Sequence, residues 1–195
     1  MLTVKSLDLA EVKAIYDTHM RDTFPPSELR PYKSIKALTN SGNYFCYGLY
    51  DEDSLQAYAF FSRAKNRAYC LLDYYAVIES LRGSGIGSQF FPLLREKLRH
   101  MDGILLEVES VESTENEEEQ AIRQRRIRFY QRNGCVMTGV KCHLYGVDYR
   151  IMAMPAAKPV PEDRSILSEL ESIYHVMFND LLYPLVCRPF IQKAE

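Results

Sequence analysis

The feature that most constrains the fold is a run of three glycines at alternate positions, Gly83, Gly85 and Gly87, within "AVIESLRGSGIGSQFFPLL" (residues 76–94). Glycine is less favourable than alanine in a helix or strand by roughly 0.5–1 kcal/mol, so three of them together indicate a local requirement. A strand pattern precedes the run, and a helical pattern and a second strand pattern, "GILLEVES", follow it. This order predicts a βαβ unit with parallel strands and a right-handed crossover.

The glycine turn is also suited to binding an anion. The first turn of a helix exposes unpaired N–H groups at the positive end of the helix dipole, and glycines let a phosphate approach that backbone closely. The arginine beside the turn adds a positive charge and several donors. We therefore predict a phosphate-binding loop made of Arg82, Gly83, Ser84, Gly85, Ile86, Gly87 and Ser88. The alternative is a glycine-rich connection that binds no ligand.

The spacing of the loop narrows the class of ligand. A Walker loop needs a lysine after its last glycine, and a dinucleotide loop needs G-x-G-x-x-G, whereas the order here is G-S-G-I-G. Arg82, Gly85 and Gly87 instead match R-x-x-G-x-G, which resembles the acyl-CoA pyrophosphate loop of the GNAT superfamily of N-acetyltransferases. The resemblance implies acetyl-CoA (coenzyme A) as cofactor. It also implies that the end of the preceding strand binds pantetheine and polarises the thioester carbonyl, at Tyr75, Ala76 and Val77.

A second segment, "RRIRFYQRNGC", resembles the second GNAT motif, in which a tyrosine precedes a glycine by four residues. Here these residues are Tyr130 and Gly134. The resemblance implies that Tyr130 is the general acid that returns a proton to the departing thiolate of CoA. The chemistry is reasonable because a thiol has a pKa of ~8.5 and a phenol one of ~10, so the tyrosine is protonated at neutral pH. The alternative is a tyrosine that only packs on an amphipathic helix.

This second segment departs from the family pattern in three places. Arg123 and Arg126 stand where the family often has asparagine and alanine, and Cys135 stands in place of an aromatic residue. Arg123 is a candidate to bind the phosphates of CoA. Its helical neighbours offer another interpretation, since Glu119 and Arg123 have the i,i+4 spacing of an ion pair.

Amine acetylation also requires a base, because an alkyl ammonium with a pKa of ~10.4 must lose a proton before it attacks. Glu107 and Glu109 lie on one face of the strand after the glycine helix, and Glu107 is the candidate base. Four residues are candidates to bind the acceptor: Glu28, Glu109, His143 and Tyr145. The alternative is that these carboxylates meet solvent or nearby arginines, and that His143 and Tyr145 are ordinary surface or core residues.

The order of expected elements resembles that of GNAT proteins, and the resemblance implies an α/β fold with a mixed central sheet flanked by helices and a parallel strand pair around the CoA loop. We expect a GNAT domain over residues 1–155, a proline-containing linker over 156–164 and a C-terminal helical extension over 165–195. The extension carries an apolar stripe of Ile166, Leu170, Ile173, Met177 and Leu181, widened by Leu167, Tyr174 and Phe178. The stripe must be buried on the domain itself, over the acceptor site or at a dimer interface, and packing on the domain is favoured.

Composition excludes other classes of protein. A formal net charge of -2 gives no case for a nucleic-acid partner. No apolar run approaches the ~20 residues of a membrane span, and "MLTVKSLDLAEV" lacks the apolar stretch of a signal peptide, so a cytoplasmic location is expected. The five cysteines are odd in number without C-x-x-C spacing, and the four histidines are scattered. Neither a metal site nor a disulfide framework is therefore expected.

Together the motifs predict an N-acetyltransferase that moves an acetyl group from acetyl-CoA to a primary amine of a small, cationic acceptor. Direct transfer in a ternary complex is expected, because none of the cysteines has a motif partner that would activate it as a nucleophile. One alternative is a CoA-binding sensor or regulatory domain without catalysis, and another is a protein-binding module that has lost the cofactor. The protein is expected as a monomer or a homodimer, and the sequence leaves the identity of the amine open.

Overall fold

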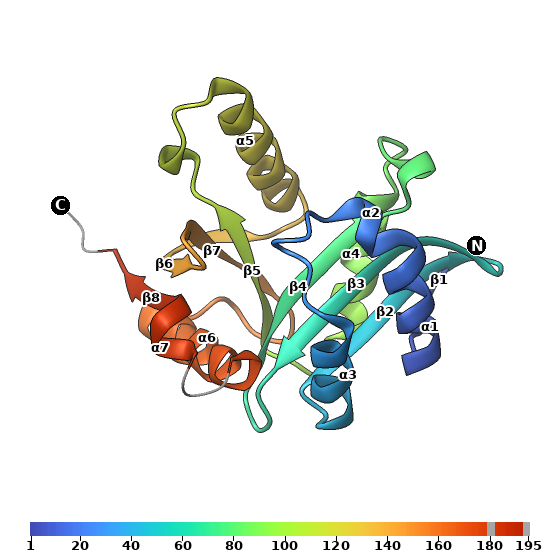
Figure 1. The fold of residues 1–195 in the computed structure, drawn as a ribbon, viewed down its shortest axis with the longest axis horizontal. Coiled ribbons are helices and arrows are strands. Elements are labelled where there is room, and N and C mark those ends of the chain that lie inside the picture. Colours follow the sequence, from blue (N-terminus) through green and yellow to red (C-terminus); the bar gives the residue numbers. More distant parts are fainter. Residues whose placement is uncertain (179–181, 193–195) are drawn as a thin grey trace. The chain divides into compact units, whose positions relative to one another are not determined.

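The computed structural model describes residues 1–178 and 182–192 (Figure 1). The chain forms two compact units, Met1–Lys65 with Leu72–Lys97, and Asn66–Leu71 with Leu98–Glu195. Within the described ranges, no helix is both long and apolar enough to cross a membrane.

The first unit is built on an antiparallel meander. It comprises β1 (Leu2–Ser6), β2 (Tyr44–Asp51) and β3 (Ser54–Arg63), followed by most of β4 (Tyr69–Val77). Leu2 pairs with Asp51, and Tyr44 pairs with Ser62. The helical segments are α1 (Leu9–Ile15), the π-helical η1 (Tyr16–Met20), α2 (Arg21–Thr23), α3 (Tyr32–Asn40), η2 (Glu79–Leu81) and α4 (Ile86–Lys97).

Local sequence explains where α1 begins. The Asp8 side chain accepts hydrogen bonds of 2.8 Å from the backbone N–H groups of Ala10 and Glu11, and the Glu11 side chain accepts one from the N–H of Asp8. This capping box satisfies donors that the first helical turn leaves unpaired. The helix then passes without a break into η1 and α2, whose C-cap residue Phe24 returns to extended backbone.

The core of the first unit is aromatic. Tyr58, Phe60 and Phe61 of β3 and Phe90 and Phe91 of α4 are almost completely buried. The central part of β3, Ala57–Ser62, is buried at every residue, which shows that both faces of this strand are covered. A strand buried on both faces reads as a continuous apolar run rather than an alternating one, as "AYAFF" does here.

The second unit is a sheet in the order β5-β7-β6-β8 with antiparallel neighbours. Its strands are β5 (Gly103–Glu109), β6 (Val136–Leu144), β7 (Val147–Pro155) and β8 (Cys187–Ile191). Its helical segments are η3 (Val111–Ser113), α5 (Glu117–Arg132), α6 (Asp163–Met177) and α7 (Tyr183–Val186).

The start of β4 belongs to this second unit and lies beside the start of β5. The N–H of Asp102 donates a 2.8 Å hydrogen bond to the carbonyl of Ala68, and a Cβ added to Gly103 would collide with the ring of Tyr69. Since the two strands begin side by side, they run parallel. The expected mixed α/β fold with helices and a parallel strand pair is confirmed.

The C-terminal segment contains more than the expected helix. Ile166, Leu170, Ile173 and Tyr174 of α6 are buried at 0% exposure, so the apolar stripe packs within the second unit. Leu181, the last member of that stripe, lies outside the described residues. After α7 the chain adds β8, which pairs with β6 from Val140↔Ile191 to Leu144↔Cys187. This strand is not among the elements expected from the sequence.

Candidate active site

The glycine loop connects η2 to α4 in the first unit. Gly83 and Gly85 have φ angles of +83° and +86°, in the left-handed region that side-chain-bearing residues rarely adopt. A Cβ added to either glycine would meet nothing within 4 Å. Backbone conformation therefore explains these two glycines, and the space beside them is open to a ligand.

Tyr75 near the end of β4 fixes the beginning of α4. Its hydroxyl donates a 2.6 Å hydrogen bond to the carbonyl oxygen of Gly87, and its ring lies 4.8 Å from that of Phe91 and 5.6 Å from that of Phe90. The neighbouring Ala76 is buried and Val77 is partly exposed. The tyrosine side chain thus connects the strand end to the glycine helix, a contact that the sequence motif does not predict.

Arg82 lies at the surface of the loop with its side chain half exposed. Its Nη2 is 3.4 Å from the Thr23 hydroxyl and its Nη1 is 3.9 Å from the Glu79 carboxylate. Both contacts are long, so a phosphate can compete for the guanidinium. Ser84 is turned back into the loop, where its hydroxyl donates a 2.6 Å hydrogen bond to the carbonyl of Leu81.

The loop fits the pyrophosphate of CoA on four counts. Two glycines leave open space, an arginine is exposed, and the first turn of α4 (Ile86, Gly87, Ser88) supplies N–H groups at the positive end of the helix dipole. The strand end that the motif assigns to pantetheine is tied to this turn through Tyr75.

Glu28 lies in the segment between α2 and α3, and its side chain is exposed. The backbone of this segment is held by Tyr74, whose hydroxyl accepts a 2.7 Å hydrogen bond from the N–H of Arg30 and donates one of 2.8 Å to the carbonyl of Glu28. Arg30 forms an ion pair of 3.3 Å with Asp73, and both side chains are largely buried. The hydroxyl of Tyr44 donates a further 2.6 Å hydrogen bond to Asp73.

Tyr130 lies in the last turn of α5, in the second unit. It is half-buried, and its ring centroid is 5.4 Å from that of Phe129. Burial raises the pKa of Tyr130 to about 12, although the nearby Arg126 acts in the opposite direction. The phenol is therefore protonated at neutral pH, as a general acid must be. The backbone carbonyl of Tyr130 accepts hydrogen bonds from Asn133 and Cys135 that close the helix before Gly134.

The two carboxylates of β5 have different partners. Glu107 accepts a hydrogen bond on its Oε1 from the hydroxyl of Tyr174 in α6. Glu109 forms ion pairs of 3.1 Å with Arg123 and 3.0 Å with Arg126, both from α5. Glu109 thus lies between two positive charges, and Glu107 is held by a neutral donor.

Arg123 is brought together with Glu109 and is 13% exposed. Its Nη1 donates hydrogen bonds of 2.8 Å to the carbonyl of Ser110 and 3.0 Å to the Ser113 hydroxyl. Its Nη2 is also 3.6 Å from Glu119, the partner that the i,i+4 spacing predicts. These contacts connect the start of α5 to the end of β5.

His143 and Tyr145 lie at the hairpin between β6 and β7. The Nδ1 of His143 is 2.8 Å from the Asp148 carboxylate, and both side chains are substantially exposed. Tyr145 and Gly146 form the turn with φ angles of +48° and +83°. The ring of Tyr145 is 62% exposed and contacts the ring of Phe178 at 5.7 Å. The ring of Phe178 in turn lies 5.8 Å from that of Tyr174 in α6.

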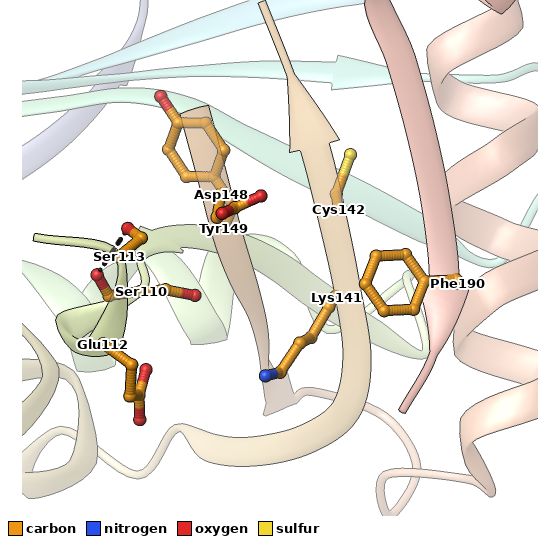
Figure 2. A pocket seen from close by; sticks show the side chains of 8 residues that line it. All are labelled: Ser110, Glu112, Ser113, Lys141, Cys142, Asp148, Tyr149 and Phe190. Carbon is orange, nitrogen blue, oxygen red and sulfur yellow. Dashed lines mark hydrogen bonds between the residues drawn. The ribbon is translucent and has the colours of Figure 1, made fainter. Parts of the chain in front are cut away.

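The second unit also contains a cavity of about 220 Å³ (Figure 2). Figure 2 shows residues of the η3 segment on one side of β6 and Phe190 of β8 on the other. The lining residues are Ser110, Glu112, Ser113, Lys141, Cys142, Asp148, Tyr149 and Phe190. Sequence reasoning named none of them, because only the pairing of β6 with β7 and β8 brings them together. Asp148 is the partner of His143, and Ser110 and Ser113 are bonded to Arg123, the partner of Glu109.

Metal ligation is not supported in the described ranges, where no group of three or more histidine, cysteine or acidic side chains could hold an ion. The five cysteines are buried and unbridged. The closest pair joins β6 to β8, with the Sγ atoms of Cys142 and Cys187 3.6 Å apart.

Comparison with known proteins places this geometry in a family. The sequence model of the acetyltransferase (GNAT) family matches residues 12–135. The chain belongs to the GNAT acetyltransferase family. Members of this family are acyl-CoA-dependent acetyltransferases, which is the enzyme class that the two motifs imply. No curated protein gave a significant sequence match.

Solved GNAT structures share the fold. A GNAT-family protein from Bacteroides thetaiotaomicron is 18% identical with a TM-score of 0.71, and the match covers 90% of this chain and 98% of that one. The ribosomal-protein-S18-alanine N-acetyltransferase of Escherichia coli is 21% identical with a TM-score of 0.59, over 84% and 98% of the two chains. Spermidine N-acetyltransferase from Vibrio cholerae, in complex with CoA and spermine, is 13% identical with a TM-score of 0.58, over 80% and 96%.

Proposed function

We propose that this GNAT protein is an N-acetyltransferase that moves an acetyl group from acetyl-CoA to a primary amine of a small, cationic acceptor. The observation that carries the proposal is the loop after β4, in which two left-handed glycines leave open space beside an exposed arginine. Solved structures of the same fold include enzymes that act on a polyamine and on a protein alanine.

The loop residues would hold the cofactor. Arg82 and the amides from Gly83 to Ser88 bind the pyrophosphate, and the backbone of Tyr75, Ala76 and Val77 binds the pantetheine arm. Through its hydrogen bond to Gly87, Tyr75 fixes the position of the strand end relative to the glycine loop. When bound, acetyl-CoA supplies an acetyl group that is activated as a thioester.

Tyr130 would hold the proton that the departing sulfur takes up. Its phenol is protonated at neutral pH because burial raises its pKa to about 12. Burial would also raise the pKa of the CoA thiol beside Tyr130, so the pKa values of the donor and of the group that takes up the proton would both be raised.

Glu107 would accept the proton of the acceptor ammonium, directly or through a water molecule. A carboxylate can bind a cationic amine and then take its proton. Glu109 is less suited to the role of base, since Arg123 and Arg126 already pair with it. Glu109, Glu28, His143 and Tyr145 remain the proposed contacts of the acceptor.

Direct transfer is favoured over a covalent acyl-enzyme. All five cysteines are buried, and burial raises the pKa of Cys135 to about 12. A thiol with so high a pKa supplies little thiolate at neutral pH, and the thiolate is the nucleophile.

The test compares wild type with Tyr130→Phe for thiol release from acetyl-CoA in the presence of a pool of primary amines. We expect amine-dependent release that falls about 100-fold or more in the variant. Tyr69→Phe is the matched control, because the Tyr69 hydroxyl is also in the second unit and is buried without a hydrogen-bond partner. Calorimetric titration with acetyl-CoA should give the same affinity for all three proteins.

Two outcomes would replace the proposal. Binding of acetyl-CoA without amine-dependent release would favour a CoA-binding sensor domain. Absence of binding would favour a protein-binding module that keeps only the fold. Splitting the amine pool after a positive result identifies the acceptor.

A further inference from the structure

The C-terminal helix α6 supplies a side chain to the candidate base. Tyr174 is completely buried, and its hydroxyl donates a hydrogen bond to Oε1 of Glu107 on β5. The two residues are 67 positions apart in the sequence. The helix lies beyond residue 135, where the match to the family model ends.

The surroundings of the pair determine what the hydrogen bond does. Among the described residues, the titratable side chains around this pair include Cys142 of β6, Cys187 of β8, Tyr183 of α7 and Glu171 of α6 itself. The bond to Cys142 and burial hold the pKa of Cys187 well above its ordinary value, so that thiol is neutral. Burial and Glu107 raise the pKa of Tyr174 well above its ordinary value, so its hydroxyl stays a donor. Farther along β5, Glu109 is paired with Arg123 and Arg126.

We propose that Tyr174 is a positioning residue of the transfer reaction, whose phenol orients the Glu107 carboxylate and keeps it ionised. A hydrogen bond to the charged form of an acid favours that form, and bonds to ionised acceptors are stronger than neutral ones. The bond occupies Oε1 and restrains rotation of the side chain. The inference rests on the proposed function, in which Glu107 is the base.

The first test measures the carboxylate directly and needs no acceptor. Glutamate labelled with ¹³C at the side-chain carboxyl is followed by NMR as the pH is changed, and the Glu107 signal is assigned by its loss in Glu107→Gln. In Tyr174→Phe we expect the titration midpoint of Glu107 to rise by about one pH unit, as loss of a hydrogen bond to a charged group implies. Tyr69→Phe again removes a buried hydroxyl without a partner and should leave the midpoint unchanged. Equal midpoints in wild type and Tyr174→Phe would overturn the proposal.

The second test asks whether Tyr174 acts through Glu107 in turnover. In a plot of kcat/KM against pH, the rise on the acidic side should move to higher pH in Tyr174→Phe. At the low-pH end of this rise, kcat/KM of the variant should be about tenfold below that of wild type. In the Glu107→Gln background the same substitution should have no further effect. An equal loss in both backgrounds would show that Tyr174 acts independently of Glu107 and would overturn the proposal.

The two tests separate the failure of the inference from the failure of the proposed function. If Glu107→Gln keeps full activity, Glu107 is not the base, and Tyr174 has no positioning role in the reaction whatever the NMR midpoint shows. If Tyr174→Phe does not fold, Glu107→Asp replaces it, because this variant keeps the charge and withdraws the carboxylate from the phenol. With aspartate labelled in place of glutamate, the midpoint of this residue, corrected for the difference of ~0.4 between the ordinary pKa values of Asp and Glu, should also rise. An unchanged value would overturn the proposal.

Discussion

The hydroxyl of Tyr75 donates a 2.6 Å hydrogen bond to the carbonyl oxygen of Gly87. This bond ties the end of β4 to the first turn of α4, and the glycine loop lies between the two. The tyrosine ring packs against Phe90 and Phe91, both of which are in the core. The conformation of the loop is therefore supported from the interior of the first unit.

Removing that hydroxyl should weaken cofactor binding. In Tyr75→Phe the ring still packs, but a hydrogen bond worth about 1 kcal/mol is lost, so the Kd for acetyl-CoA should rise about threefold to tenfold. Ser62→Ala is the control, since the Ser62 hydroxyl is in the same unit and is buried without a hydrogen-bond partner. Calorimetry on the three proteins measures the effect. Equal affinities would show that the bond does not support the loop.

The left-handed glycine nearest α4 should tolerate no side chain. Gly85→Ala places a Cβ at a φ of +86°, which costs roughly 1–2 kcal/mol, and the methyl group occupies the open space beside the loop. We expect the Kd for acetyl-CoA to rise about tenfold or more. Gly42→Ala bears similar strain at a φ of +74°, after α3. It should lose similar stability in thermal unfolding and keep its affinity; a parallel loss of affinity would mean that the effect is one of stability alone.

The ion pair of Arg30 with Asp73 should contribute strongly to stability. Asp73→Asn removes the charge of Asp73 beside the largely buried guanidinium of Arg30, which costs about 3 kcal/mol, or roughly 6–12 °C in Tm for a chain of this length. Proteolysis should then cut first between α2 and α3, where Arg30 and Tyr74 hold the backbone. Asp53→Asn, at an exposed pair with Lys5, should change Tm little. Equal effects of the two substitutions would contradict this interpretation.

The contribution of Tyr130 should not vary across the usual pH range. The proton-donating form is present below the pKa of about 12 and is lost only as pH rises through that value. The ratio of wild-type to Tyr130→Phe kcat should therefore stay constant from pH 7 to about pH 10, while both rates rise as the acceptor amine loses its proton. A ratio that falls toward one between about pH 9 and 10 would show that the phenol ionises near its ordinary pKa of ~10.

Oxidation should join Cys142 to Cys187. Their Sγ atoms are 3.6 Å apart, and a disulfide needs a separation of about 2.05 Å. The two cysteines are diagonal neighbours in the pairing of β6 with β8, so forming the bond requires a local movement of these strands. Incubation with an excess of a small disulfide oxidant, followed by peptide mapping, should give this bridge before any that involves Cys46, Cys70 or Cys135. Reaction should be slow, since both thiols are buried. A different first bridge would contradict the pairing of β6 with β8.

Features encoded by neighbouring residues could be predicted from the sequence. The capping box of Asp8 and Glu11 and the i,i+4 pair of Glu119 and Arg123 depend on helical spacing alone, and both are present. The turn at Gly83 and Gly85 could be predicted because a strand that enters a helix through a tight turn needs left-handed residues, and glycine supplies them.

Contacts between distant residues could not be predicted in this way. Tyr174 is part of an apolar stripe, and the stripe predicts only that its ring is buried. The partner of its hydroxyl, Glu107, is seen only once α6 is packed in the fold. Strand β8 is short and contains Pro189, which weakens the strand signal, and its register with β6 depends on the fold of the whole second unit. The cavity beside Lys141 and Phe190 follows from that register.

Strand β8 is an edge strand of the sheet, and its sequence protects that edge against aggregation with other chains. An uncovered strand offers unpaired N–H and C=O groups to any other chain, and β8 takes up those of β6. Pro189 has no N–H to offer, and Arg188 adds a charge, so β8 is itself a poor template for a further strand. A chain shortened before Cys187 would expose β6, and aggregation through that strand would then compete with folding.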